Sequence, residues 1–117
     1  VYEYAHATLE EALTLMFDHQ EAMFSDFGFG IPLVHSEADY THPIRMGDKL
    51  VIRMELQRIG KRSVTFDYQI TGEDGVPRCS IRLVHAFIDM ASFEGIPVPQ
   101  AFLDALPRAG LSLPSTA

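Results

Sequence analysis

The apolar residues at the start of the chain recur with the period of a helix. Residues 2–17 carry apolar side chains at every third or fourth position, which places them on one face of an α-helix. These side chains are Ala5, Leu9, Ala12, Leu13 and Met16. No Ser, Thr, Asp or Asn stands ahead of Val1 to cap this helix. We therefore predict a long helix and expect that further sequence precedes Val1.

The pattern then changes to the period of two that is typical of strands. Residues Ile31 to Tyr40 form the first predicted strand. Apolar and polar residues alternate over 50–57 and again over 64–70, which predicts a hairpin with long arms. A fourth strand is expected from Arg78 to Asp89, and its apolar residues on both faces indicate either a central strand of the sheet or a strand at an interface.

The connections carry turn and loop signals. Residues 18–30 form a Phe-rich connector, Thr41–Asp48 a bend, and Gly72–Gly75 a tight turn. A short helix is predicted at Gln100–Leu106. Pro107–Ala117 is predicted to be a frayed tail.

One helix followed by four strands joined largely by hairpins defines an α+β domain over residues 1–106, with a C-terminal tail at 107–117. The simplest way to pack these elements together is an antiparallel sheet curled around the apolar face of the helix. The outer face of that sheet would still have to be shielded from water, so we expect the protein to self-associate.

Composition narrows the class of protein. A chain of 117 residues is one domain with a real core. It has no apolar run long enough to span a membrane and no secretion signal, and its single Cys79 cannot form an internal disulfide. These features favour the cytoplasm. A net charge of −7 argues against non-specific nucleic-acid binding.

The positive charge is concentrated in the middle of the chain. Six of the nine Lys and Arg residues fall between residues 30 and 70, and the first 44 residues have none. The six are Arg45, Lys49, Arg53, Arg58, Lys61 and Arg62. The middle of the chain is therefore positively charged in a protein whose net charge is negative. This indicates either solubilising charge on exposed strands or an anionic ligand near the turn at Gly60.

The ordered series of segments resembles the hot-dog fold. After the helix come PLVHSEADYTHPIRMGDKLVIRMEL, the turn IGKRS, the strand VTFDYQI, the strand end HAFID and then IPVPQAFLDAL. Over residues 1–106 the chain is similar to the 4-hydroxybenzoyl-CoA thioesterase-like group of acyl-CoA thioesterases. The PLVH start, with Asp39-Tyr40 and Pro43 behind it, is similar to the 1,4-dihydroxy-2-naphthoyl-CoA hydrolases of that group.

The resemblance implies an antiparallel sheet wrapped around one long central helix, with the family's N-terminal strand lying outside this chain. It also implies a cytoplasmic homodimer or homotetramer with its active site at a dimer interface. The enzyme would hydrolyse an aromatic or medium-chain acyl-CoA by carboxylate-assisted attack of water. It would need no metal and no cofactor beyond the coenzyme A of its substrate. The family's catalytic Asp precedes the helix, whose N-terminal amides polarise the thioester carbonyl, so we expect that Asp upstream of Val1.

The resemblance places a coenzyme A phosphate site at the turn of the hairpin. Lys61, Arg62 and Ser63 match the family position where basic residues meet these phosphates, and Arg58 would help from the same side. The alternative is an ordinary solvated hairpin tip. If the substrate were carried by an acyl carrier protein, as in polyketide release, these cations would face the carrier surface.

Two residues of the chain are candidates for catalysis. His35 lies in the strand expected to pass near the helix N-terminus of a partner subunit, where it would orient substrate; the alternative is a buried, hydrogen-bonded histidine. Glu11, with Glu10 beside it, is the helix carboxylate that would serve as an alternative base, although such carboxylates are usually solvated. His85 is expected to be structural.

Other features leave alternatives open. Phe24, Phe27 and Phe29 would line an acyl pocket or pack in the core. The histidines and Cys79 show no ligand spacing, so no metal site is proposed. A non-catalytic module that binds acyl-CoA is a second interpretation. A dehydratase or hydratase is a third, and it would need His35 to face Glu10 or Glu11.

Overall fold

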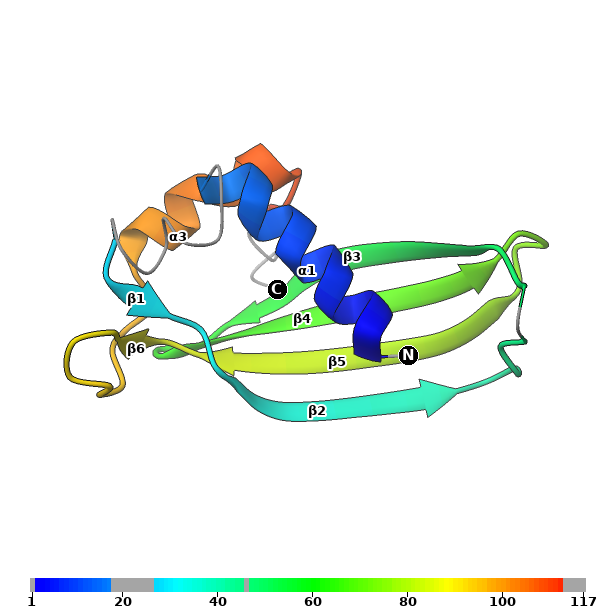
Figure 1. Ribbon diagram of the computed structural model, residues 1–117, viewed down its shortest axis with the longest axis horizontal. Coiled ribbons are helices and arrows are strands. Elements are labelled where there is room, and N and C mark those ends of the chain that lie inside the picture. The colour runs from blue at the N-terminus through cyan, green and yellow to red at the C-terminus, as the bar shows by residue number, and fades with distance from the viewer. Residues whose placement is uncertain (1, 18–26, 46, 113–117) are drawn as a thin grey trace.

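A computed structural model describes residues 2–17, 27–45 and 47–112, and it shows a long helix lying across one face of an antiparallel sheet (Figure 1). The helix α1 spans Tyr2–Phe17. The sheet has the order β2-β5-β4-β3, with β2 at Leu33–Tyr40, β3 at Leu50–Ile59, β4 at Ser63–Gly72 and β5 at Pro77–Ala86. A second, two-stranded sheet pairs β1 (Phe29–Gly30) with β6 (Ile88–Asp89). Helix α3 (Gln100–Ala105) and the 3-10 helix η1 (Leu106–Ala109) follow.

The predicted apolar stripe of α1 is confirmed as the face that meets the sheet. Ala5, Leu9, Ala12, Leu13 and Met16 are all buried. The two central strands of the sheet, β4 and β5, contribute the core residues that face them. These core residues include Phe66, Tyr68, Ile70, Ile81 and Leu83, none more than 2% exposed. Removal of this apolar surface from water is the main force that holds the helix against the sheet.

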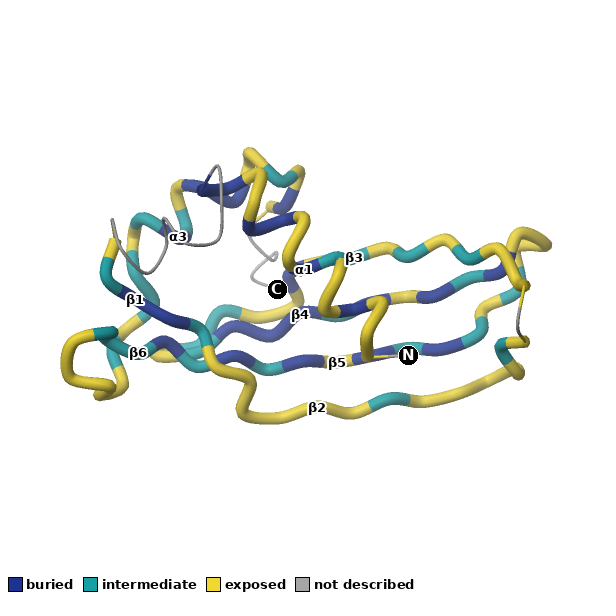
Figure 2. Tube along the Cα trace, viewed as in Figure 1, coloured by how far each residue is buried: buried dark blue, intermediate teal, exposed yellow. Residues whose placement is uncertain are grey.

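The outer face of the sheet is polar. Arg82 on β5 donates from Nε to Asp67 Oδ1 (2.8 Å) and from Nη2 to Asp67 Oδ2 (3.1 Å). Polar side chains of this kind are stable in water, but Val51 of β3, which lies beside Arg53 and Glu55, is 62% exposed. The other exposed apolar side chains of the sheet include Leu33, Val34 and Tyr40 of β2, which is exposed along most of its length (Figure 2).

The packed part of the chain extends past the predicted boundary at residue 106. Leu111 is buried, and Arg108 Nη1 donates to the Met16 carbonyl at the end of α1 (3.2 Å). Gly110 has a φ of 71°, which lets the chain turn so that the Leu111 N–H bonds to the Leu106 carbonyl (3.2 Å). Within the described ranges, no helix is long and apolar enough to cross a membrane.

Candidate functional site

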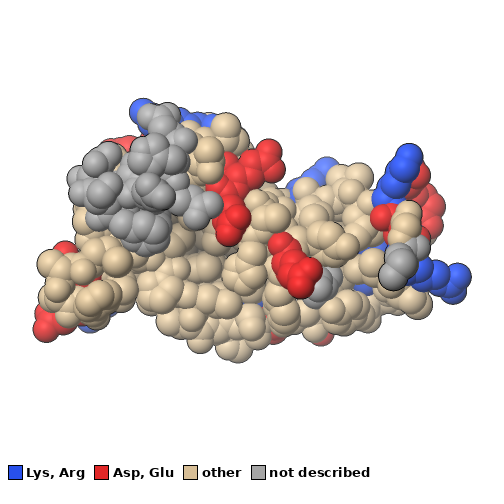
Figure 3. All heavy atoms as spheres, viewed as in Figure 1, with Lys and Arg blue, Asp and Glu red and all other residues tan. Residues whose placement is uncertain are grey.

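A cleft of ≈ 360 Å³ opens between α1 and the place where the sheet bends. Four residues of one helix face line it on the α1 side: His6, Leu9, Glu10 and Leu13. The opposite wall comes from the β1–β2 junction and from the end of β5 and the segment that follows it. That wall consists of Gly30, Ile31, Pro32, His85, Ile88 and Met90. On the face seen in Figure 3, acidic side chains lie over α1, and the surface beside them is largely uncharged.

The bend exists because β1 and β6 pair apart from the main sheet. Phe29 faces Asp89 and Gly30 faces Ile88 in the short sheet, and β2 then begins at Leu33. Phe29 is held in the core by Phe87, with ring centroids 5.8 Å apart. Residues 30–32 are therefore fixed at both ends and form a wall over the end of β5.

His85 forms the polar part of that wall. Its side chain is on the inner face of β5, where only 3% of the residue is exposed. Nδ1 lies 2.9 Å from the Ile31 carbonyl oxygen, which can only accept, so Nδ1 carries the proton and Nε2 a lone pair. Burial lowers the pKa of His85, the hydrogen bond to Ile31 partly offsets this, and the charge of His6 lowers it further. The ring is therefore neutral at neutral pH.

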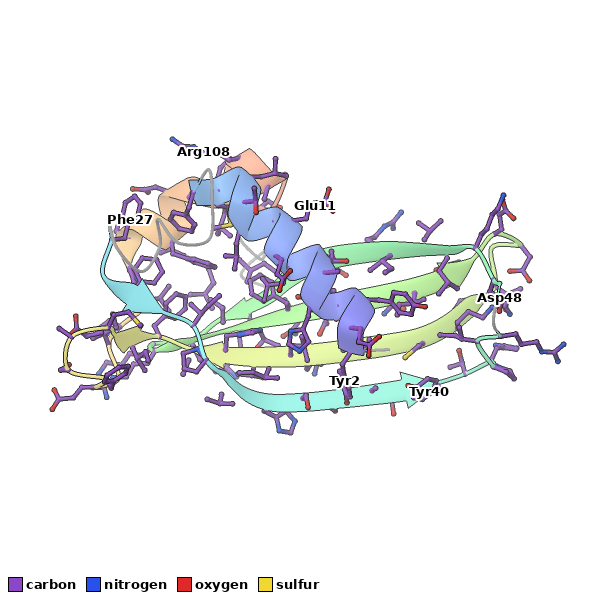
Figure 4. All side chains as sticks on the ribbon, in the orientation of Figure 1. Tyr2, Glu11, Phe27, Tyr40, Asp48 and Arg108 are labelled. Atoms are coloured by element: carbon purple, nitrogen blue, oxygen red, sulfur yellow. The ribbon has the colours of Figure 1, made fainter. Side chains whose placement is uncertain are left out.

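The two catalytic candidates from the sequence do not meet. Glu11 is exposed on α1 and points away from the sheet (Figure 4). His35 pairs with Val84 on the outer face of the sheet, and its Nε2 lies 3.3 Å from Glu37 Oε1. With 58% of its side chain exposed, His35 is not the buried histidine of the alternative interpretation. Within the described part of a single chain, His35 therefore does not face a carboxylate of α1.

Glu10 is the carboxylate that α1 brings to the cleft. It lies one turn after His6, and both line the cleft. The sequence led us to name Glu11 as the candidate base, with Glu10 only beside it, but of the two it is Glu10 that lines the cleft. The spacing of His6, Leu9, Glu10 and Leu13 could have shown this in the sequence, because it places these four residues on one helix face beside the apolar stripe.

The basic turn sits on a fixed backbone. The Gly60 N–H donates to the Ser63 carbonyl (2.8 Å), and the carbonyls of Lys61 and Arg62 accept from Val98 and Phe87 (3.0 Å each). A Cβ at residue 60 would lie 2.9 Å from Ser63 Oγ, so glycine allows this close approach.

The cations at and beside the turn are exposed. Arg58, Lys61 and Arg62 take part in no ion pair among the described residues. Cations held on a rigid turn without an acidic neighbour are available to an anionic ligand.

The two connector phenylalanines that the structure describes, Phe27 and Phe29, do not line the cleft. Phe29 is in the core, and the half-exposed Phe27 packs edge-on against Phe17 with ring centroids 5.2 Å apart. Phe24 lies outside the described residues. In the part of the chain that the structure describes, no group of His, Cys, Asp and Glu residues could hold a metal ion.

Comparison with known proteins gives a family and a fold. The model of the Thioesterase-like superfamily matches residues 3–106. A 1,4-dihydroxy-2-naphthoyl-CoA hydrolase from Synechococcus elongatus is 28% identical over 102 residues, which are 86% of this chain and 74% of that protein. A 1,4-dihydroxy-2-naphthoyl-CoA thioesterase from Synechocystis superimposes with a TM-score of 0.78 at 22% identity, over 91% of this chain and 78% of that one. A gentisyl-coenzyme A thioesterase gives 0.73 at 17% identity, over 90% and 81%.

The helix and four-stranded antiparallel sheet are therefore those of the hot-dog fold, as the resemblance predicted. The chain belongs to the Thioesterase-like superfamily and is an acyl-CoA thioesterase.

Proposed function

We propose that this thioesterase hydrolyses an aromatic acyl-CoA, with the phosphates at the basic turn and the acyl group in the cleft. The observation that carries the proposal is a set of exposed cations that have no acidic partner among the described residues: Lys61 and Arg62, beside Ser63 on one fixed turn, and Arg58 at the end of β3. Two further facts support it. The cleft is mainly apolar, and the similar proteins are named for dihydroxynaphthoyl-CoA and gentisyl-CoA, both aromatic thioesters.

We assign Glu10 as the base of this reaction. The carboxylate takes a proton from water while the water oxygen bonds to the thioester carbonyl carbon. The C–S bond then breaks, and the sulfur leaves as a thiolate that takes up a proton. Both Glu10 and Glu11 are exposed, but only Glu10 lines the cleft, which suits it to this role.

The phosphate site is tested by removing its charge. Lys61→Ala with Arg62→Ala should raise KM for a CoA thioester roughly 10-fold or more, because charge-assisted hydrogen bonds to phosphate are lost. KM for the matching pantetheine thioester, which lacks the nucleotide, should stay within about 2-fold. Steady-state kinetics on both substrates gives the comparison.

Lys49→Ala with Arg53→Ala is the matched control, because it removes the same charge from β3 and the loop before it. Lys49 is 3.9 Å from Glu73, beside the β4–β5 turn and away from Gly60. Equal effects of the Lys61 and Arg62 changes on both substrates would show that these residues do not contact the nucleotide.

The same cations would also suit an acidic acyl carrier protein. In that case a carrier-linked thioester would react faster than the CoA thioester, and the difference would shrink as salt screens the association. Kinetics with both substrates at low and high salt would show whether the cations bind coenzyme A or an acyl carrier protein.

The assignment of Glu10 predicts different results for two adjacent carboxylates. Glu10→Gln should lower kcat about 100-fold or more, since a positioned general base contributes that much. Glu11→Gln makes the same chemical change one residue away and should leave kcat unchanged. Single-turnover rates at saturating substrate measure both, and a Glu10→Gln variant with the wild-type rate would refute the assignment.

We also infer that two copies associate along β2. In the described part of the chain β2 pairs with β5 on one side only. Its apolar side chains Leu33, Val34 and Tyr40 are 41%, 59% and 62% exposed. A long edge strand with exposed apolar residues is a natural template for pairing with a second copy.

A further inference from the structure

The loop at 89–95 presents the most exposed large apolar side chain among the described residues. This side chain is Phe93, which is 69% exposed. Its φ is 60°, and no other non-glycine residue in the described ranges has a positive φ. A bulky residue in this left-handed region is energetically unfavourable. An exposed aromatic ring held at such a cost is a candidate for binding, because strained residues cluster at ligand sites.

Hydrogen bonds fix the backbone that carries this ring. Asp89 Oδ2 accepts from the N–H groups of Ala91 (3.2 Å) and Ser92 (2.9 Å), and from the Ser92 hydroxyl (3.0 Å). The Phe93 N–H donates to the Asp89 carbonyl (2.7 Å), and the Asp89 N–H donates to the Glu94 carbonyl (2.9 Å). A loop that is already held in one conformation loses little conformational freedom when a ligand binds.

The loop is joined to the basic turn. The Phe87 N–H donates to the Arg62 carbonyl, and the Val98 N–H donates to the Lys61 carbonyl (3.0 Å each). The Phe87 carbonyl accepts from Ile96 (2.9 Å), so the segments that enter and leave the loop lie together beside the turn. Two residues of extended chain, roughly 7 Å, separate Phe87 from the start of the loop. Figure 1 shows the β3–β4 turn and the loop after β6 at the same end of the sheet.

The turn and the loop differ in charge in a way that suits a nucleotide. Lys61 and Arg62 are exposed cations, whereas the loop has no cation and its exposed Glu94 would repel phosphate. The turn is therefore suited to an anion, and the ring of Phe93 to an uncharged flat group. A ligand that joins phosphates to an aromatic base satisfies both. The ribose between the phosphates and the base of coenzyme A lets that ligand extend from the turn to the loop.

We propose that Phe93 is the stacking platform for the adenine of coenzyme A. This inference rests on the proposed function, because it takes the anion at the basic turn to be the phosphates of coenzyme A. Every base has a flat face that stacks on an aromatic side chain, and the stacking contributes to affinity without any hydrogen bond. The exposure of Phe93 leaves its ring accessible to the base.

Binding of coenzyme A, measured by titration calorimetry, tests the proposal apart from catalysis. Phe93→Ala should raise Kd roughly 5-fold or more, the effect of losing one stacked base. Phe93→Tyr keeps an aromatic face and should stay within about 2-fold of the wild type. Tyr4→Ala is the matched control, because it removes an exposed aromatic side chain from α1, and it should leave Kd unchanged. An unchanged Kd in Phe93→Ala would refute the proposal.

A second variant separates binding from a purely structural role. Asparagine tolerates the left-handed region better than phenylalanine, so Phe93→Asn should be at least as stable as the wild type in chemical denaturation. The same variant should bind coenzyme A as weakly as Phe93→Ala. A Phe93→Asn protein that is less stable but binds coenzyme A as tightly as the wild type would show that the ring serves the fold alone.

Contacts in the wild-type complex give a readout that needs no variant. Nuclear Overhauser effects should connect the Phe93 ring protons to adenine H2 or H8, and a bound base without such contacts would overturn the proposal. If Phe93→Ala weakens binding and Lys61→Ala with Arg62→Ala does not, the stacking stands and the phosphate site fails. If only the Lys61 and Arg62 changes weaken binding, the role of Phe93 fails alone. If the wild-type protein does not bind coenzyme A, both proposals fail.

Discussion

At the scale of single residues, His85 links the stability of the protein to pH. Burial lowers its pKa below the usual 6.5, whereas in the unfolded chain the ring titrates near that value. As pH falls below about 6.5, the unfolded state therefore binds more protons than the folded state. Stability contributed by the neutral ring is present above pH 6.5 and is lost as pH falls toward the folded pKa.

Urea unfolding at pH 7.5 and 5.5 measures this effect. The wild-type protein should lose more free energy of unfolding between these pH values than His85→Asn, because the variant has no group that titrates at this position. His6 and Glu10 line the same cleft and remain in both proteins, so their contribution cancels to first order. Equal losses would mean that His85 does not resist protonation in the folded state.

At the scale of elements, the β4–β5 turn depends on the backbone of Gly75. Its φ is 81°, and its N–H donates to the Gly72 carbonyl (3.0 Å). Asp74 completes the turn by accepting from the Val76 N–H (3.0 Å) and from Arg78 (2.9 Å). The first of these bonds is the main reason that the pKa of Asp74 is lowered.

Gly75→Ala should lower the free energy of unfolding by about 1 kcal/mol, the usual cost of a side chain in the left-handed region. An added Cβ would meet nothing within 4 Å, so the loss comes from the backbone alone. Gly75→Asn should cost less, because asparagine tolerates this conformation. Chemical denaturation of the three proteins measures the order, and an alanine variant as stable as the wild type would show that the turn relaxes.

At the scale of the whole molecule, α1, β3 and β4 could be predicted because each has one face that is more buried than the other. The apolar stripe of α1 and the alternation of apolar and polar residues in β3 and β4 show in the sequence which face is buried. The β1–β6 pair and η1 were missed because two to four residues are too short to show a period.

The candidate site was less predictable than the fold. The basic turn is local, so the positions of Lys61 and Arg62 followed from the sequence. Glu10 and His85 line the same cleft but are far apart in the chain, and no local pattern shows that they come together. Likewise, alternation gives two faces to β2, but it cannot say that His35 is on the face away from α1.

The strand order β2-β5-β4-β3 has a consequence for amide hydrogen exchange. The amides of β4 and β5 are flanked by strands on both sides, whereas in the described chain β2 and β3 each have one neighbour in this sheet. Alternate amides of β2 therefore point away from β5 and should exchange quickly in a single copy. If copies associate along β2, raising the protein concentration should slow these amides and leave the outward amides of β3 fast. Mass spectrometry or NMR would then identify the edge that carries the assembly, and rates in β2 that do not change with concentration would argue against it.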